Sequence, residues 1–177
     1  MKQYIFLFIL NLIISTAFCQ EVLINGDHKN RLLTWDDFTG KPDKSSVHEA
    51  NTYWKLNYRF QGITFNGDTA KFNELSVKLE LDKDKTWIKS GKETPGLLKH
   101  EQGHFDIGLL CQQEIIHQFN NTVFLKSDFQ NKLQNLFTTI LNKYKLMGIK
   151  YDEETRHSQN KENQEKWNSF FANELNR

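Results

Sequence analysis

The sequence predicts an α+β fold: a small antiparallel β-sheet, then a helix that carries the pattern H-E-x-x-H, then further C-terminal helices. Two observations lead to this prediction. In two stretches, 54–60 and 75–81, apolar side chains occur at every second position, as in strands that bury one face. After Gly91 the apolar spacing changes to that of one face of an α-helix. Strands followed by helices along the chain are typical of α+β domains.

Length, charge and composition exclude several classes of protein. The chain has 177 residues, which suits a single domain, here 20–177, behind a short leader, 1–19. It carries 23 Lys and Arg against 22 Asp and Glu, so it lacks the basic excess with which proteins neutralise nucleic-acid phosphates. Aromatic residues make up 13% of the chain and can build a core, which excludes an acidic disordered protein.

The first residues resemble a secretory signal peptide. Lys2 precedes an apolar run from Tyr4 to Ile14, and small residues lead to a cleavage site before Gln20. We therefore expect export to the periplasm or the cell exterior, with no membrane span in the mature chain. Lipid anchoring through Cys19 is a further interpretation, against which the bulky Phe18 argues. Removal of residues 1–19 leaves Cys111 alone, without a partner for an internal disulfide.

The strands are expected in this order. Residues 31–35 are a short strand candidate, and 39–49 are rich in turn residues and form a loop. The alternating stretches within 53–82 surround Asn66-Gly67-Asp68, a hairpin-turn signal, and predict one antiparallel hairpin. Trp87 and Ile88 can add a further short strand.

The helices follow. We predict the first over about 95–120, because Thr94 suits an N-cap and Pro95 a first helical position. The second is expected over 127–146, with Gly148 ending it, and a third over 158–175.

The motif that predicts a metal site is His100-Glu101-Gln102-Gly103-His104. On a helix, residues four apart share a face, so His100 and His104 can bind one metal ion. Zinc favours such neutral imidazole nitrogens. Glu101 would then act as general base on a metal-activated water, whose pKa the ion lowers.

Two histidines leave such a site incomplete, because catalytic zinc takes three protein ligands. Leu110 stands where the extended metzincin pattern requires His, so that subclass is excluded. His157 is the favoured third ligand, and the carboxylates of Asp152, Glu153 and Glu154 are the alternatives. Tyr151 is a candidate donor to a developing oxyanion, or else a packed aromatic residue. Of the remaining candidates, His28 and His48 are interpreted as solvated, His117 as a surface residue and Cys111 as buried.

Four stretches resemble the DUF922 family of exported bacterial proteins, which are described as zinc-dependent proteases. They are Leu33–Phe38 with Gly40-Lys41-Pro42, Thr52-Tyr53-Trp54, His100–Asp106, and Tyr151–His157. The last is similar to the family pattern Y-D-x-x-T-x-H-G, with Ser158 in place of the Gly. The resemblance implies a zincin-like fold and a metallopeptidase.

The sequence therefore favours an exported zinc-dependent metallohydrolase, a peptidase acting on a peptide or protein substrate. The alternative is a non-catalytic cell-envelope module with a structural or vestigial metal site. A membrane-tethered accessory protein is a third hypothesis.

Overall fold

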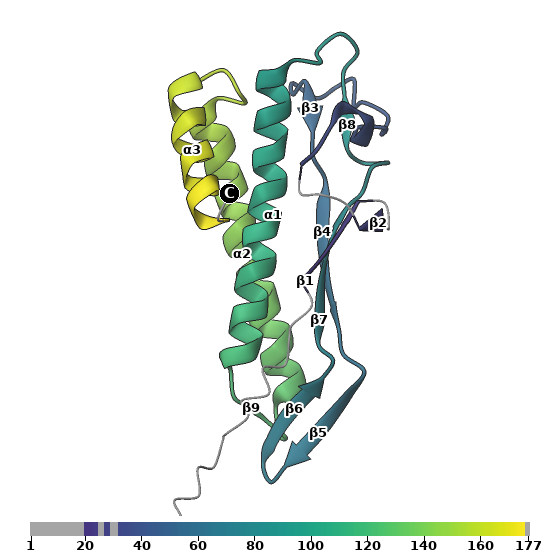
Figure 1. Ribbon diagram of the computed structural model, residues 1–177, viewed down its shortest axis with the longest axis vertical. Coiled ribbons are helices and arrows are strands. Elements are labelled where there is room, and N and C mark those ends of the chain that lie inside the picture. The colour runs from purple at the N-terminus through teal and green to yellow at the C-terminus, as the bar shows by residue number, and fades with distance from the viewer. Residues whose placement is uncertain (1–19, 25–26, 29–31, 176–177) are drawn as a thin grey trace, which may run out of the picture.

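The computed structural model describes residues 20–24, 27–28 and 32–175. The long helix α1 (Pro95–Asn121) lies between two layers: the strands cover one side, and helices α2 (Phe129–Thr155) and α3 (Lys161–Glu174) cover the other (Figure 1). Small, largely antiparallel sheets, formed mostly by strands that precede the first helix, are combined with three helices, which confirms the predicted α+β class. The predicted signal peptide lies outside the described residues.

The predicted hairpin is present and forms the centre of the strand layer. Trp54 pairs with Leu81 and Gly62 pairs with Asn73, so one antiparallel register continues through a bend down to the turn at Gly67. The two arms comprise four strands: β4 (Trp54–Arg59), β5 (Gly62–Asn66), β6 (Thr69–Asn73) and β7 (Ser76–Leu81).

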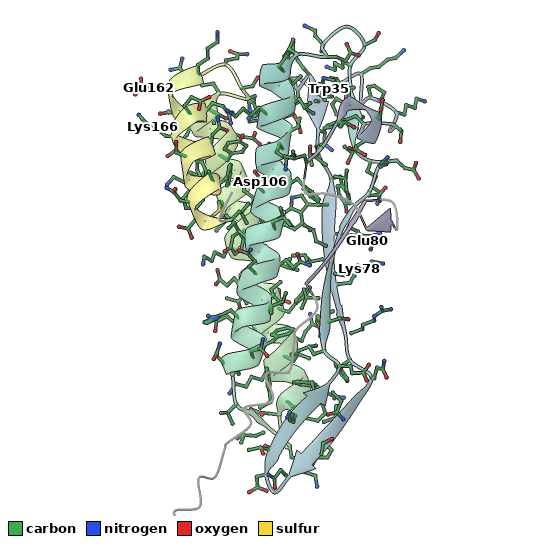
Figure 2. All side chains as sticks on the ribbon, viewed as in Figure 1. Trp35, Lys78, Glu80, Asp106, Glu162 and Lys166 are labelled. Carbon is green, nitrogen blue, oxygen red and sulfur yellow. The ribbon has the colours of Figure 1, made fainter. Side chains whose placement is uncertain are left out.

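One face of β7 builds the core. Val77, Leu79 and Leu81 are buried, while Lys78 and Glu80 lie on the face turned away from α1 and form an ion pair with a 3.5 Å separation (Figure 2). This alternation places the apolar half of the strand against the helix.

The remaining strands lie outside the hairpin. β1 (Gln20–Ile24) runs parallel to β7, a pairing that the sequence does not predict, and β2 (Asp27–His28) pairs with β1. The predicted strand at Trp87 and Ile88 is present as β8 and pairs with β3 (Ala50–Asn51), while β9 (Phe124–Leu125) pairs with β6.

The strand predicted over 31–35 is wrong for the residues that the structure describes there. Residues 32–34 form no strand, and Trp35–Asp37 is a 3₁₀ turn, η1. The cause is Asp37, whose Oδ2 accepts a hydrogen bond from the Thr34 N–H at 2.9 Å and closes a capping box. A local side-chain acceptor thus competes successfully with a β-ladder.

Helix α1 agrees with its prediction, and its start is fixed by a cap. The Thr94 hydroxyl accepts a hydrogen bond from the Leu97 N–H at 3.2 Å, and Pro95 follows in the first turn. Phe105 and Leu109 are fully buried toward the core. At Gly108 the helix touches the sheet so closely that a Cβ there would lie 2.9 Å from Cδ2 of Trp54.

Helix α2 does not end at Gly148, as the sequence analysis predicts, but continues to Thr155. A Cβ at Gly148 would meet nothing within 4 Å, so this glycine serves no turn and merely weakens the helix locally. Tyr144 and Tyr151, two turns apart, are both buried and hold the helix against the core on either side of it. The extension brings Asp152 onto the last turn of α2. Within the part of the chain that the structure describes, no helix is both long and apolar enough for a membrane span.

The two glycines predict opposite effects of the same substitution. Gly148→Ala should raise the free energy of unfolding by about 0.5–1 kcal/mol, because it adds helix propensity in open space. Gly108→Ala should lower it by about 1–3 kcal/mol, because the new methyl group overpacks against Trp54. Urea denaturation of both variants measures the difference, and equal effects would contradict the close approach at Gly108.

Candidate metal centre

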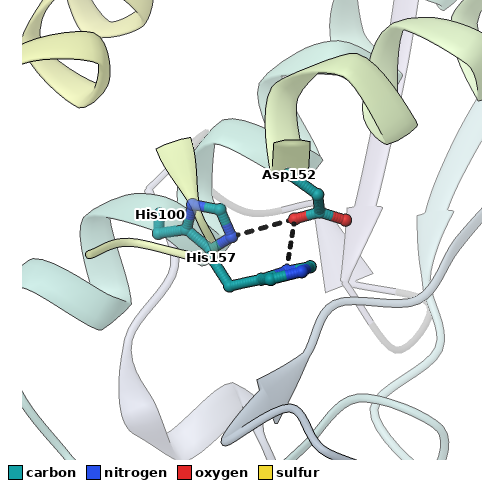
Figure 3. Close-up of side chains that lie close together, drawn as sticks. All are labelled: His100, Asp152 and His157. Atoms are coloured by element: carbon teal, nitrogen blue, oxygen red, sulfur yellow. Dashed lines mark hydrogen bonds and ion pairs between the residues drawn. The ribbon is translucent and has the colours of Figure 1, made fainter. Parts of the chain in front are cut away.

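The ends of two helices far apart in sequence meet at the candidate site. His100 and His104 lie one turn apart near the start of α1, with their ring centroids 4.9 Å apart. Helix α2 runs back along α1 (Figure 1). Its last turn therefore brings Asp152 to the same place. His157 follows in the turn after α2, and its ring approaches the same Asp152 oxygen as the ring of His100 (Figure 3).

Three imidazoles converge on one carboxylate oxygen. Oδ1 of Asp152 lies 3.2 Å from Nε2 of His100, 3.0 Å from Nε2 of His104 and 3.2 Å from Nδ1 of His157. The ligand atoms of His100, Asp152 and His157 all lie within 4.8 Å of one another, so these three residues could hold a metal ion. The sequence poses His157 and Asp152 as alternatives, and the structure brings both to the same point.

Glu153 and Glu154, the other two carboxylate candidates, are directed elsewhere. Glu153 is exposed, and Oε2 of Glu154 accepts a hydrogen bond from the Trp167 indole N–H at 2.8 Å. Helical geometry explains the selection, because residues 152, 153 and 154 project about 100° apart around α2. Only Asp152 projects toward α1.

A hydrogen-bond network behind His100 fixes its tautomer. Nδ1 of His100 lies 3.2 Å from Oε1 of Gln164, an atom that can only accept, so Nδ1 carries the proton. The orientation of Gln164 is set in turn, because its Nε2 donates to the Tyr151 hydroxyl at 2.7 Å and to Asn168 Oδ1 at 3.0 Å. Metal-binding histidines typically donate their second ring N–H in this way.

This tautomer leaves a lone pair on Nε2 of neutral His100, and the lone pair faces the Asp152 carboxylate. Two such electron-rich atoms repel unless a proton or a cation lies between them. An oxygen with two lone pairs also cannot accept a good hydrogen bond from each of three imidazoles. The donor set therefore fits a shared metal ion, and the fit rests on this chain's own hydrogen bonds.

The charges at the site are tightly linked. When no cation lies between these atoms, protons take its place: burial alone would raise the pKa of Asp152, but the hydrogen bonds and charges of protonated His100 and His104 then hold it well below its usual range. Burial likewise would lower the pKa of His104, yet the hydrogen bond to Asp152 and the neighbouring charge of Glu101 raise it. Asp152 is thus present as the carboxylate, the form that binds metals.

The turn that presents His157 has an unusual backbone. Arg156, His157 and Ser158 have φ values of 48°, 51° and 76°, all in the left-handed region. The His157 N–H donates to the Asp152 carbonyl at 3.1 Å, and the Asn160 N–H donates to the Thr155 carbonyl at 2.7 Å. Main-chain bonds thereby fix the position of His157 relative to Asp152, although its side chain is 47% exposed.

Glu101 lies beside the imidazoles and is held in place by Thr52, which the sequence analysis names only within a stretch that resembles the family and not as a site residue. The Thr52 hydroxyl donates to Oε2 of Glu101 at 2.7 Å. Glu101 is 3% exposed, yet it lines an open cavity of about 420 Å³ together with His100, His104, Asp152 and His157. The carboxylate can therefore reach a water molecule or a substrate in the cavity.

Tyr151 lies behind the site and does not line the cavity. It is fully buried, its ring stacks on His100 at a centroid distance of 4.7 Å, and its hydroxyl donates to the His100 carbonyl at 3.0 Å. Burial raises the pKa of this hydroxyl. An oxyanion role would require the hydroxyl to leave the His100 carbonyl and turn toward the cavity.

Gly103 makes this packing feasible. A Cβ at position 103 would lie 2.3 Å from the Tyr151 hydroxyl oxygen, so only glycine admits the ring beneath the H-E-x-x-H turn. The glycine inside the motif therefore has a packing reason.

The structure also places a fourth histidine at the site. His48, interpreted from sequence as solvated, lines the cavity, and its ring centroid lies 4.4 Å from that of His157. No periodicity or spacing in the sequence links residues 48 and 157. Among the other candidates, His117 is exposed, Cys111 is fully buried, and His28 lies where side chains are outside the described part of the chain.

The comparisons with known proteins give a family and nothing further. The profile of a family described as "Bacterial protein of unknown function (DUF922)" matches residues 32–158. The chain belongs to the DUF922 family. No curated protein and no solved structure matches it. The DUF922 match includes every residue that lines the cavity except Gln159, so the site lies within the family's own region.

The backbone of the 156–158 turn gives a prediction for this DUF922 protein. Ser158→Gly should raise the free energy of unfolding by about 0.5–1 kcal/mol, because glycine adopts positive φ without a Cβ clash. Ser127→Gly, at an exposed turn position where φ is not positive, is the matched control and should be neutral or destabilising. Urea denaturation compares the two, and equal responses would argue against strain at Ser158.

The Cys111 environment predicts an unreactive thiol. Burial raises the pKa of Cys111 to about 12, with a further contribution from the charge of Glu114. At pH 8 only about one thiol in ten thousand would be ionised. In a Cys19→Ser chain, Ellman's reagent should give no rapid reaction until guanidinium unfolds the protein. Stoichiometric labelling of the folded protein within seconds would contradict the buried position.

Proposed function

We propose that this DUF922 protein is an exported zinc-dependent metallohydrolase, and that its substrates are peptides. The observation that carries the proposal is the convergence of three imidazoles and the Asp152 carboxylate on one point beside a buried glutamate, within one cavity. His100 and His104 would hold the ion together with His157, and Asp152 either joins them or moves aside. A zincin-like arrangement and a secretory leader are parts of the same proposal.

The ion, when bound, would polarise a substrate carbonyl and lower the pKa of a coordinated water. The chain's own groups do the rest. Glu101 accepts a proton as water attacks the carbonyl carbon and later gives it to the departing amine nitrogen. Thr52 holds one carboxylate oxygen of Glu101, which keeps the other free to face the cavity. Tyr151 and Gln164 keep His100 in the tautomer that a metal needs.

The alternative is a non-catalytic envelope module whose metal is structural. One observation favours it: with Asp152 the site offers four protein donors, which would fill a tetrahedral shell. A closed shell leaves no position for water, so the two functions differ in whether the loaded protein turns over a substrate.

The decisive variant is Glu101→Gln. We expect it to keep the zinc of the wild type, measured by elemental analysis after dialysis, and to hydrolyse fluorescently labelled casein about 10²–10⁴-fold more slowly. Glu153→Gln removes an exposed carboxylate outside the cavity and should match the wild type in both measurements. Loss of hydrolysis with zinc retained supports the enzyme. Zinc retained in a wild type that hydrolyses nothing supports the structural module, and a wild type without zinc contradicts both.

Metal binding itself can be measured without a substrate. Zinc at 100 times its dissociation constant should stabilise the folded wild type by about 2.7 kcal/mol, seen as a rise in thermal midpoint. His104→Ala should lose most of this rise. An equal rise in the variant would show that zinc binds elsewhere.

A further inference from the structure

His48 lies in the wall of the cavity, and the proposed function does not yet assign it a role. Its side chain is exposed and lines the cavity, and its ring lies against that of His157 at 4.4 Å, with the ring planes inclined by 58°. Among the described residues, its ring nitrogens have no hydrogen-bond partner. An imidazole beside the reacting centre, with both nitrogens free, is available to a ligand.

The segment that carries His48 is fixed to the body of the protein on both sides. The His48 N–H donates to Oγ of Ser46 at 3.1 Å, and the Ser46 carbonyl accepts a hydrogen bond from Nζ of Lys89 at 2.5 Å. The Glu49 carbonyl accepts from the Lys89 N–H at 2.8 Å, next to the β3–β8 pair. The backbone thus holds His48 at the cavity before any substrate arrives, as a group that stabilises a developing charge must be held.

Other polar groups on the same wall are already engaged. The Thr52 hydroxyl donates to Glu101, the Asn51 amide donates to the Lys85 carbonyl at 3.1 Å, and the Tyr151 hydroxyl does not reach the cavity. Gln159 also lines the cavity, but it follows the ligand turn, whereas the His48 ring touches a candidate ligand directly.

We propose that His48 is a catalytic residue that donates a ring N–H to the carbonyl oxygen of a bound peptide, which gains negative charge during hydrolysis. The inference rests on the proposed function and deepens it. As the water oxygen bonds to the carbonyl carbon, the C=O π electrons move onto the oxygen, and the His48 N–H bonds to that oxygen. The water proton passes to Glu101. An electron pair of the oxyanion then re-forms the C=O bond as the C–N bond breaks, the C–N electron pair stays on nitrogen, and Glu101 returns the proton there.

The test uses three variants of His48 in the zinc-loaded full chain. His48→Phe keeps a ring against His157 and removes the donor, His48→Gln keeps a donor and removes the ring, and His48→Ala removes both. His117→Phe is the matched control, because His117 is exposed on α1 far along the helix from the cavity. The probe is a phosphonamidate peptide, whose tetrahedral phosphorus and charged oxygens imitate the attacked carbonyl. Calorimetry measures its affinity, and competition with a chromophoric chelator measures zinc affinity.

We expect His48→Phe and His48→Ala to weaken phosphonamidate binding by about 10- to 100-fold, with kcat on labelled casein falling by about 10²–10³-fold. His48→Gln should recover part of both losses. Zinc affinity should stay within about threefold of the wild type in all of them, and His117→Phe should change nothing.

Other outcomes would overturn the proposal in recognisable ways. If His48→Phe binds the phosphonamidate as the wild type does, His48 makes no contact with the oxyanion. If zinc affinity falls in His48→Ala and is restored in His48→Phe, His48 is a positioning residue for His157. If the wild type takes up zinc and hydrolyses casein but none of the variants differs from it, only the role of His48 fails. If the wild type binds neither zinc nor the phosphonamidate, the proposed function itself has failed, and the role of His48 fails with it.

Discussion

The meeting of three imidazoles with the Asp152 carboxylate is the constraint on which the rest of the structure depends. It requires the start of α1 and the end of α2 to lie side by side, and the packing around it serves that requirement. Tyr151 fills the space between the helices, and Gly103 is the residue that lets it approach. The hydrogen bonds of Gln164 bring α3 into the same arrangement, so all three helices contribute to one small volume.

The chemistry of this volume depends on the role that Asp152 takes. As a fourth donor, its carboxylate would complete a tetrahedral shell and make the metal a structural element. Turned aside, it would leave three imidazoles and an open position next to Glu101. Our proposal takes the second arrangement, because the site opens into a cavity that is also lined by Glu101, whose carboxylate Thr52 holds. The proposed catalytic function follows from this comparison.

Local patterns in the sequence predicted the elements but not the contacts between them. Alternation and a turn signal were sufficient for the hairpin, and a cap with a helical stripe was sufficient for α1. The end of α2 was misjudged, because Gly148 reduces helix propensity by about 1 kcal/mol and the burial of Tyr144 and Tyr151 outweighs it. The strand over 31–35 was wrong because the Asp37 cap is a local interaction that apolar content does not reveal.

For the candidate site, too, the sequence predicted the residues within one helix but not those that tertiary packing adds. His100 and His104 are four residues apart, which is about one helical turn, so the sequence alone predicted that both rings lie on one face of α1. The joint presence of Asp152 and His157 depends on a left-handed turn of three residues, and no sequence rule anticipates three consecutive positive φ values in Arg156, His157 and Ser158. His48 and Thr52 come to the site only through tertiary packing, because each lies at least 45 residues from its partner there.

The separation of the ligands along the chain has a consequence for folding. His100 and Asp152 are 52 residues apart, and the single described cysteine is free, so no covalent cross-link spans that segment. A cation bound by residues at both ends would cross-link this segment as a disulfide does. In the chain-entropy treatment, closing a loop of this length stabilises the folded state by about 4 kcal/mol. Loss of the ion would then remove about this much stability from the contact between the start of α1 and the end of α2, and a chelator would destabilise the whole fold, because α2 also packs on the hairpin.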